Sequence, residues 1–153
     1  MAPYAGFPPH IFQAAFFVSL LLAASVADIR KRVIPDSVCA LIALAGLICF
    51  SPAKLSGALA ALPLLIAAIG KEGSIGGGDI KLTAASGLVL GFAGGVAGLM
   101  VGLAAILLFF AGGIAAHRIR KDKVRKKSET ALPMAPFLST GFIIVYLLIH
   151  FGF

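Results

Sequence analysis

Two aspartates that lie far apart in the chain, Asp28 and Asp79, stand directly beside long apolar stretches. Asp28 follows the run Ala24-Ser25-Val26-Ala27, and Asp79 follows Gly76-Gly77-Gly78 where another apolar run begins. An ionisable side chain beside a bilayer is costly, so each aspartate needs a chemical or a structural reason. Two carboxylates held close together share one proton, and then one acts as a base towards water while the other donates a proton to a carbonyl oxygen. The two residues are therefore a candidate dyad for hydrolysis.

Each aspartate also has a structural interpretation that the sequence leaves open. Asp28 ends a predicted helix, where the macrodipole disfavours negative charge, and it can form an ion pair with Arg32 four residues later. Asp79 can be the N-cap of the next helix, with the three glycines as a flexible connector. Asp36 follows Pro35 and precedes an apolar run, which is an ordinary helix start, so we assign Asp36 a capping role without chemistry.

Other site chemistries find little support in the sequence. The segment Gly76–Asp79 is neither a Walker loop nor a dinucleotide fingerprint, because the first pattern is incomplete and no strand precedes it. Cys39 and Cys49 fall in one predicted helix about 15 Å apart, so they neither pair nor form a metal site together. The three histidines are scattered singly. We expect no metal and no cofactor.

Composition places the chain in a membrane. Of its 153 residues 60% are hydrophobic and 12% are charged, and its mean hydropathy is +1.06, which argues against a soluble protein. The net charge of +7 comes from short basic runs between apolar stretches, where it determines topology and does not indicate nucleic-acid binding. We predict an all-α polytopic membrane protein with a single domain over residues 1–153.

The apolar stretches predict a bundle of about six transmembrane helices. The charge-free stretch 82–116 would form a helix of about 52 Å, too long for a hydrocarbon core of about 30 Å, so it should fold back at the glycine-rich segment Gly91–Gly98. The predicted helices cover residues 11–27, 37–53, 55–70, 80–93, 97–116 and 133–151.

Basic residues predict the orientation of the bundle. With the first connection in the cytoplasm, every Lys and Arg except Lys54 lies inside, so both termini face outward and both aspartates lie at the cytoplasmic face. The basic segment from Arg118 to Lys127 would touch anionic lipid head groups. An alternative is a signal peptide cleaved after Ala27, although no Lys or Arg precedes that run and Arg30–Arg32 oppose translocation.

These motifs carry a family resemblance. The segment Asp28–Asp36 resembles the first aspartate motif of the type IV prepilin peptidases, and Gly76–Asp79 fits their GxGD motif. Lys81 also matches the usual pattern, and Pro133–Phe137 with Gly141 resembles the segment that enters their last helix. The resemblance covers about residues 11–150.

The resemblance implies an aspartic endopeptidase of the inner (cytoplasmic) membrane. It would cut the short basic leader of prepilins or pseudopilins at the cytoplasmic face, with Asp28 and Asp79 as the catalytic residues and Asp36 outside the chemistry. Gly76, Gly77 and Gly78 would let a substrate backbone lie alongside, and Lys81 would contact substrate or anchor the helix at the interface.

The length of the chain affects the expected activity. Longer family members carry an N-terminal domain with paired CxxC motifs, and some also methylate the new N-terminus. Here ten residues precede the first predicted helix and no CxxC occurs, which argues against methyltransferase activity. The size resembles the short peptidases of tight-adherence (Flp) pilus systems.

Two other classes of function stay open at this point. A small transporter or proton channel would use the aspartates as an ion relay, but such sites favour the midplane and often accompany internal repeats, whereas the acidic residues here are interfacial. A non-catalytic subunit of a pilus assembly machine would tolerate replacement of both aspartates by asparagine.

Overall fold

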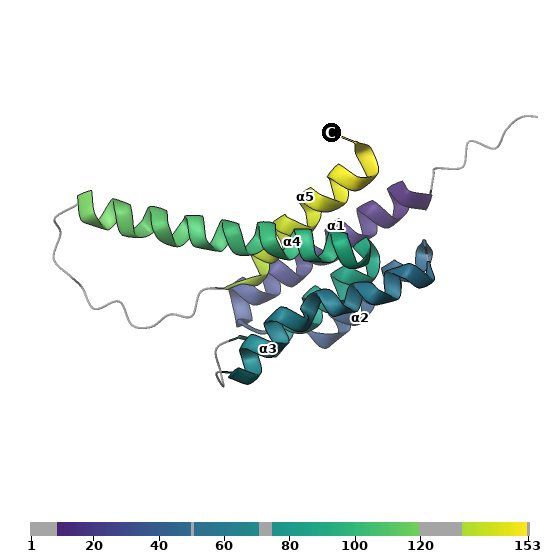
Figure 1. Ribbon diagram of the computed structural model, residues 1–153, viewed down its shortest axis with the longest axis horizontal. Helices are drawn as coiled ribbons and strands as arrows, with labels where there is room; N and C mark the ends of the chain where they lie inside the picture. Colours follow the sequence, from purple (N-terminus) through teal and green to yellow (C-terminus); the bar gives the residue numbers. More distant parts are fainter. Residues whose placement is uncertain (1–8, 50, 71–74, 120–132, 153) are drawn as a thin grey trace, which may run out of the picture.

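The described part of the chain is built from helices. The computed structural model describes residues 9–49, 51–70, 75–119 and 133–152. Its elements are α1 (Pro9–Lys31), α2 (Asp36–Ile48), the 3-10 helix η1 (Pro52–Ala61), α3 (Leu62–Gly70), α4 (Gly77–Ile119) and α5 (Ala135–Phe151) (Figure 1). With η1 and α3 as one span and α4 as two halves, these residues form six helical segments, as the sequence predicts.

Helix length and composition agree with a polytopic membrane protein. Within the described ranges, three spans are long and apolar enough to cross a bilayer: Ile11–Lys31, Pro52–Gly70 and Gly77–Gly113. Large apolar side chains on the outside, such as Leu107 and Leu108 at 69% and 73% exposed, are suited to contact with lipid. The basic segment that we expect to touch lipid head groups falls mainly on residues 120–132, outside the described part.

The long apolar stretch folds back as expected, but over a shorter turn than the sequence suggests. α4 is broken at Gly91 alone, which has φ 79° and ψ 175°. This left-handed φ favours a residue without a Cβ. The helices predicted over 80–93 and 97–116 are in fact residues 77–90 and 92–119, because Gly94, Gly95 and Gly98 are helical. The second half of α4 then extends well beyond the other helices (Figure 1).

Other helix boundaries also differ from the prediction. α1 continues one turn past residue 27 to Lys31, since charged residues at a membrane surface remain compatible with a helix. α2 ends at Ile48, five residues before the predicted end. The span expected as one helix over 55–70 begins as a 3-10 helix at Pro52, which occupies the first helical position where its missing N–H is harmless.

Buried side-chain hydrogen bonds tie α1 to its neighbours. The amide of Gln13 donates to the carbonyl oxygen of Ala45 in α2 at 2.8 Å, and the hydroxyl of Tyr146 in α5 donates to the Gln13 amide oxygen at 3.3 Å. Near the middle of α1, the hydroxyl of Ser139 in α5 donates to the carbonyl oxygen of Leu21 at 3.2 Å. Such bonds fix how helices pair where lipid, not water, surrounds them.

Glycine allows α4 and η1 to pack backbone against backbone. A Cβ added at Gly57 would overlap the carbonyl oxygen of Gly87, and one added at Gly87 would overlap the carbonyl oxygen of Gly57. Close approach through small residues is a common way for membrane helices to associate. This contact holds the first half of α4, which carries Asp79, against the span that precedes it.

We predict that Gly87→Ala destabilises the protein by about 1–3 kcal/mol, because the added methyl group forces η1 and α4 apart. The matched control is Gly112→Ala in the same helix, where an added Cβ meets nothing within 4 Å. The control keeps or slightly raises stability, because alanine is the better helix former. Thermal unfolding in detergent measures both, and equal melting temperatures would contradict the packing role of Gly87.

Candidate active site

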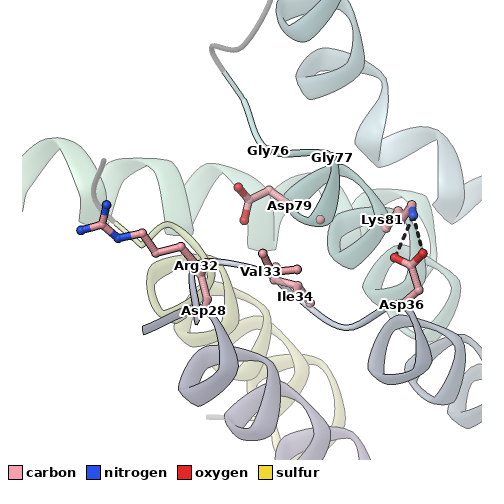
Figure 2. Close-up of a pocket in the computed structure, with 10 residues that line it drawn as sticks. Asp28, Arg32, Val33, Ile34, Asp36, Gly76, Gly77, Asp79 and Lys81 are labelled. Atoms are coloured by element: carbon pink, nitrogen blue, oxygen red, sulfur yellow. Dashed lines mark hydrogen bonds and ion pairs between the residues drawn. The ribbon is translucent and has the colours of Figure 1, made fainter. Parts of the chain in front are cut away.

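Both candidate aspartates line a single pocket at the end of the bundle where α1 ends and α4 begins. The pocket has a volume of about 300 Å³. It is formed by the end of α1, the loop into α2 and the first turn of α4, and Figure 2 draws its side chains. The lining residues are Asp28, Arg32, Val33, Ile34, Asp36, Gly76, Gly77, Gly78, Asp79 and Lys81.

Asp28 is held by the N-terminus of the last helix. It lies in the final turn of α1 and is 8% exposed. Its Oδ2 accepts a hydrogen bond of 2.9 Å from the backbone N–H of Ala135, the first residue of α5. The ion pair with Arg32 that the spacing allows does not occur in the described structure. Asp28 therefore caps the N-terminus of α5. The spacing of residues along α1 alone does not reveal this contact.

Asp79 is the third residue of α4 and leaves one carboxylate oxygen without a protein partner. Its backbone N–H donates to the carbonyl oxygen of Gly76 at 3.0 Å, so Asp79 lies inside the first turn and is not the N-cap. Among the described residues nothing forms a hydrogen bond with its buried Oδ1. A buried oxygen without a partner needs water or ligand, so this carboxylate is available for chemistry.

The backbone around both aspartates favours negative charge. Asp28 binds an amide of the first turn of α5, and Asp79 lies in the first turn of α4. Helix N-termini carry partial positive charge and unsatisfied N–H groups, and both stabilise a nearby carboxylate. Burial of Asp79 and the negative charge of Asp28 both oppose this effect.

The glycine segment brings the first turn of α4 against the loop that follows α1. A Cβ added at Gly78 would lie 3.1 Å from the Cβ of Ile34, and one at Gly76 would lie 3.2 Å from Oδ2 of Asp79, whereas one at Gly77 would meet nothing. Ile34 is itself buried. Close contact between Gly78 and Ile34 thus sets how near the Asp79 turn lies to the segment that carries Asp28.

Asp36 and Lys81 form an ion pair on the opposite side of the pocket from Arg32 (Figure 2). The Lys81 ammonium donates to both carboxylate oxygens of Asp36 at 2.7 and 2.8 Å. Asp36 is the first residue of α2 and makes no capping hydrogen bond, so the N-cap role predicted for it is wrong. The pair joins α2 to α4, but side-chain exposures of 55% for Lys81 and 74% for Asp36 limit its strength.

Comparison with known proteins identifies the family of this chain. The model of the type IV leader peptidase family matches residues 15–118, a range that includes both aspartates. The chain belongs to this family. It is also 34% identical over 151 residues to the prepilin leader peptidase/N-methyltransferase of Bacillus subtilis. That alignment covers 93% of the chain and 58% of the longer relative. No solved structure matches.

Metal ligands do not gather in the described part of this leader peptidase family member. No group of three or more His, Cys, Asp or Glu side chains is placed there to hold an ion. The acidic side chains of the pocket are Asp28, Asp79 and the ion-paired Asp36. Carboxyl groups of this kind can act as acids and as bases.

We predict that Asp28 has a structural role that can be separated from its chemical one. Asp28→Asn keeps an oxygen that accepts the Ala135 N–H bond, whereas Asp28→Ala leaves that N–H buried and unpaired, so Asp28→Ala should be about 1–3 kcal/mol less stable than Asp28→Asn. At position 79 the same two substitutions should differ by less than they do at position 28, because among the described residues no hydrogen bond to the Asp79 Oδ1 is lost. Thermal unfolding of the four variants tests this contrast, and an equal Asn–Ala difference at both positions would refute it.

Proposed function

We propose that this protein is a membrane aspartic endopeptidase that removes the short basic leader of prepilin or pseudopilin substrates. The observation that carries the proposal is the single pocket lined by Asp28 and Asp79 in a chain of the leader peptidase family. The name of the Bacillus subtilis relative supports a prepilin substrate. The proposal covers leader cleavage and not the methylation that this name also includes, because the pocket offers groups suited to hydrolysis.

In the proposed mechanism the two carboxylates share one proton around a water molecule. The ionised carboxylate takes a proton from the water while the water oxygen attacks the scissile carbonyl carbon. The other carboxyl group, which is protonated, donates its proton to the carbonyl oxygen. The tetrahedral intermediate then collapses as the C–N bond breaks. The carboxyl group that took the water proton passes it to the leaving nitrogen, and the other carboxylate takes a proton from a hydroxyl of the intermediate, which restores the shared proton. Asp28, held by Ala135, and Asp79, with its free oxygen, supply the two carboxyl groups.

The proposed site faces the cytoplasm at the inner membrane. Twelve of the thirteen Lys and Arg residues then lie on the cytoplasmic side, as the positive-inside rule requires, and both termini face outward. A basic leader held in the cytoplasm would meet the pocket there, with the apolar segment of the substrate in the bilayer. In this arrangement Gly76, Gly77 and Gly78 lie beside the substrate backbone, and Lys81 lies at the rim.

The direct test is coexpression with a prepilin-like substrate, followed by separation of precursor and mature forms on a gel. Asp28→Asn and Asp79→Asn should each abolish leader removal, because each removes one carboxyl group from the dyad. Arg30→Gln, an exposed change in the same turn of α1 as Asp28, should leave cleavage intact. Processing that persists in either aspartate variant would rule out the dyad mechanism.

A second test concerns the contact between Gly78 and Ile34. Gly78→Val places a branched side chain against Ile34 and should push the Asp79 turn away from Asp28, so cleavage should fall by tenfold or more, on the scale of about 1 Å of misplacement. Gly112→Val introduces the same side chain in α4 where nothing lies nearby, and it should cleave like wild type. Equal turnover by the two valine variants would show that the contact does not position the dyad.

A further inference from the structure

Arg32 adopts a backbone conformation that arginine rarely takes. It directly follows α1 with φ 53°, and it is the only residue other than glycine with positive φ in the described part of the chain. Glycine is the usual residue at this helix-ending position, because a Cβ crowds the following carbonyl oxygen there. The backbone N–H of Arg32 donates to the carbonyl oxygen of Asp28 at 2.8 Å, a bond that a glycine would make equally well. The helix end alone therefore does not explain an arginine.

The side chain of Arg32 belongs to the pocket wall. In Figure 2 the Arg32 guanidinium extends away from the Lys81–Asp36 pair, and Asp79 is drawn between Arg32 and that pair. Within the described residues the guanidinium makes no hydrogen bond or ion pair, whereas Lys81 is bound to Asp36. Of the two cations that line the pocket, Arg32 is thus the one available to a ligand.

General helix electrostatics do not require this arginine. A positive charge near a helix C-terminus is favourable, but Arg30 and Lys31 already provide two such charges in the last turn of α1. Both lie outside the pocket lining. Arg32 differs from them because its side chain forms part of the pocket that also contains Asp28 and Asp79, and backbone strain that the fold retains at such a site suggests a role for the side chain.

We propose that Arg32 is a substrate-positioning residue that binds the carboxylate of an acidic side chain on the substrate while Asp28 and Asp79 act on the peptide bond. The inference rests on the proposed peptidase function. A guanidinium presents paired N–H donors that match the two oxygens of a carboxylate. A lipid phosphate offers similar oxygens, but Arg32 shares its pocket with the aspartates that must meet the substrate, so the substrate is the assigned source.

The test uses purified protein in nonionic detergent and a prepilin-like fusion protein with a basic leader and an apolar helix. Each acidic residue of the fusion protein is replaced in turn by its amide. Arg32→Gln should raise KM about tenfold with little change in kcat, and one amide substrate should do the same to the wild type. The two changes together should be no worse than either alone, because they remove the same contact. Arg32→Lys should be intermediate, and Arg30→Gln should match wild type.

A stability measurement separates this role from a structural one. Arg32→Gly removes the backbone strain, so it should raise the melting temperature by about 2–4 °C while it weakens cleavage as Arg32→Gln does. A lower melting temperature for Arg32→Gly would mean that the arginine stabilises the end of α1, and it would overturn the proposal.

Three further outcomes would also overturn the proposal. The first is an unchanged KM for Arg32→Gln while wild type cleaves the fusion protein. The second is equal loss on every substrate, with no amide variant that removes the Arg32 effect. The third is an effect that vanishes in detergent and appears only in phosphatidylglycerol vesicles, which would assign the guanidinium to lipid phosphate. If wild type itself cleaves nothing, the proposed function fails, and this inference fails with it.

Discussion

The hydrogen bond between the Asp28 carboxylate and the Ala135 amide joins the first and last helices of the bundle. It brings together the C-terminal end of α1 and the N-terminal end of α5, residues 107 positions apart in sequence. Each end alone has a problem, since Asp28 lies at the unfavourable end of its own helix and α5 begins with amides that lack intrahelical partners. The hydrogen bond gives the Ala135 amide a partner and stabilises the Asp28 carboxylate. It also places one carboxylate of the pocket at a fixed position.

The rest of the pocket is assembled around that fixed carboxylate by weaker contacts. Gly78 lies against Ile34 in the α1–α2 loop, and Lys81 binds Asp36 at the start of α2, so the beginning of α4 is held at two points. Deeper in the bundle, the close approach of Gly57 and Gly87 packs η1 against the first half of α4, which carries Asp79. The position of Asp79 thus depends on glycine at two of these contacts, Gly78 with Ile34 and Gly57 with Gly87, because each requires a backbone without a side chain in the way.

Much of the fold could be predicted from the sequence, because apolar runs and charge placement obey simple length rules. The all-helical membrane class, the fold-back within residues 82–116 and the proximity of Asp28 and Asp79 to one pocket all follow from such patterns. The ends of the helices are harder to predict from the sequence. The break in α4 is confined to Gly91, because the glycines that follow it are helical and pack against other helices. The hydrogen bond of Asp28 to Ala135 cannot be predicted from the sequence, because a contact between residues 107 positions apart leaves no local signal. For Asp36 the local pattern is misleading. The sequence around it predicts an N-cap, whereas its carboxylate forms an ion pair with Lys81.

The polar bonds along α1 imply that the two sides of the pocket differ in freedom. α1 is pinned to α5 near both of its ends, by Gln13 with Tyr146 and by Asp28 with Ala135, and near its middle by Ser139. Sliding one of these helices past the other would break three bonds in a setting where lipid offers no replacement partners. Among the described residues, the turn that carries Asp79 is held to its neighbours by van der Waals contact between Gly78 and Ile34 and by the exposed ion pair of Lys81 with Asp36. Widening of the pocket is therefore easiest by displacement of the α4 turn, while the side of the pocket that carries Asp28 stays in place.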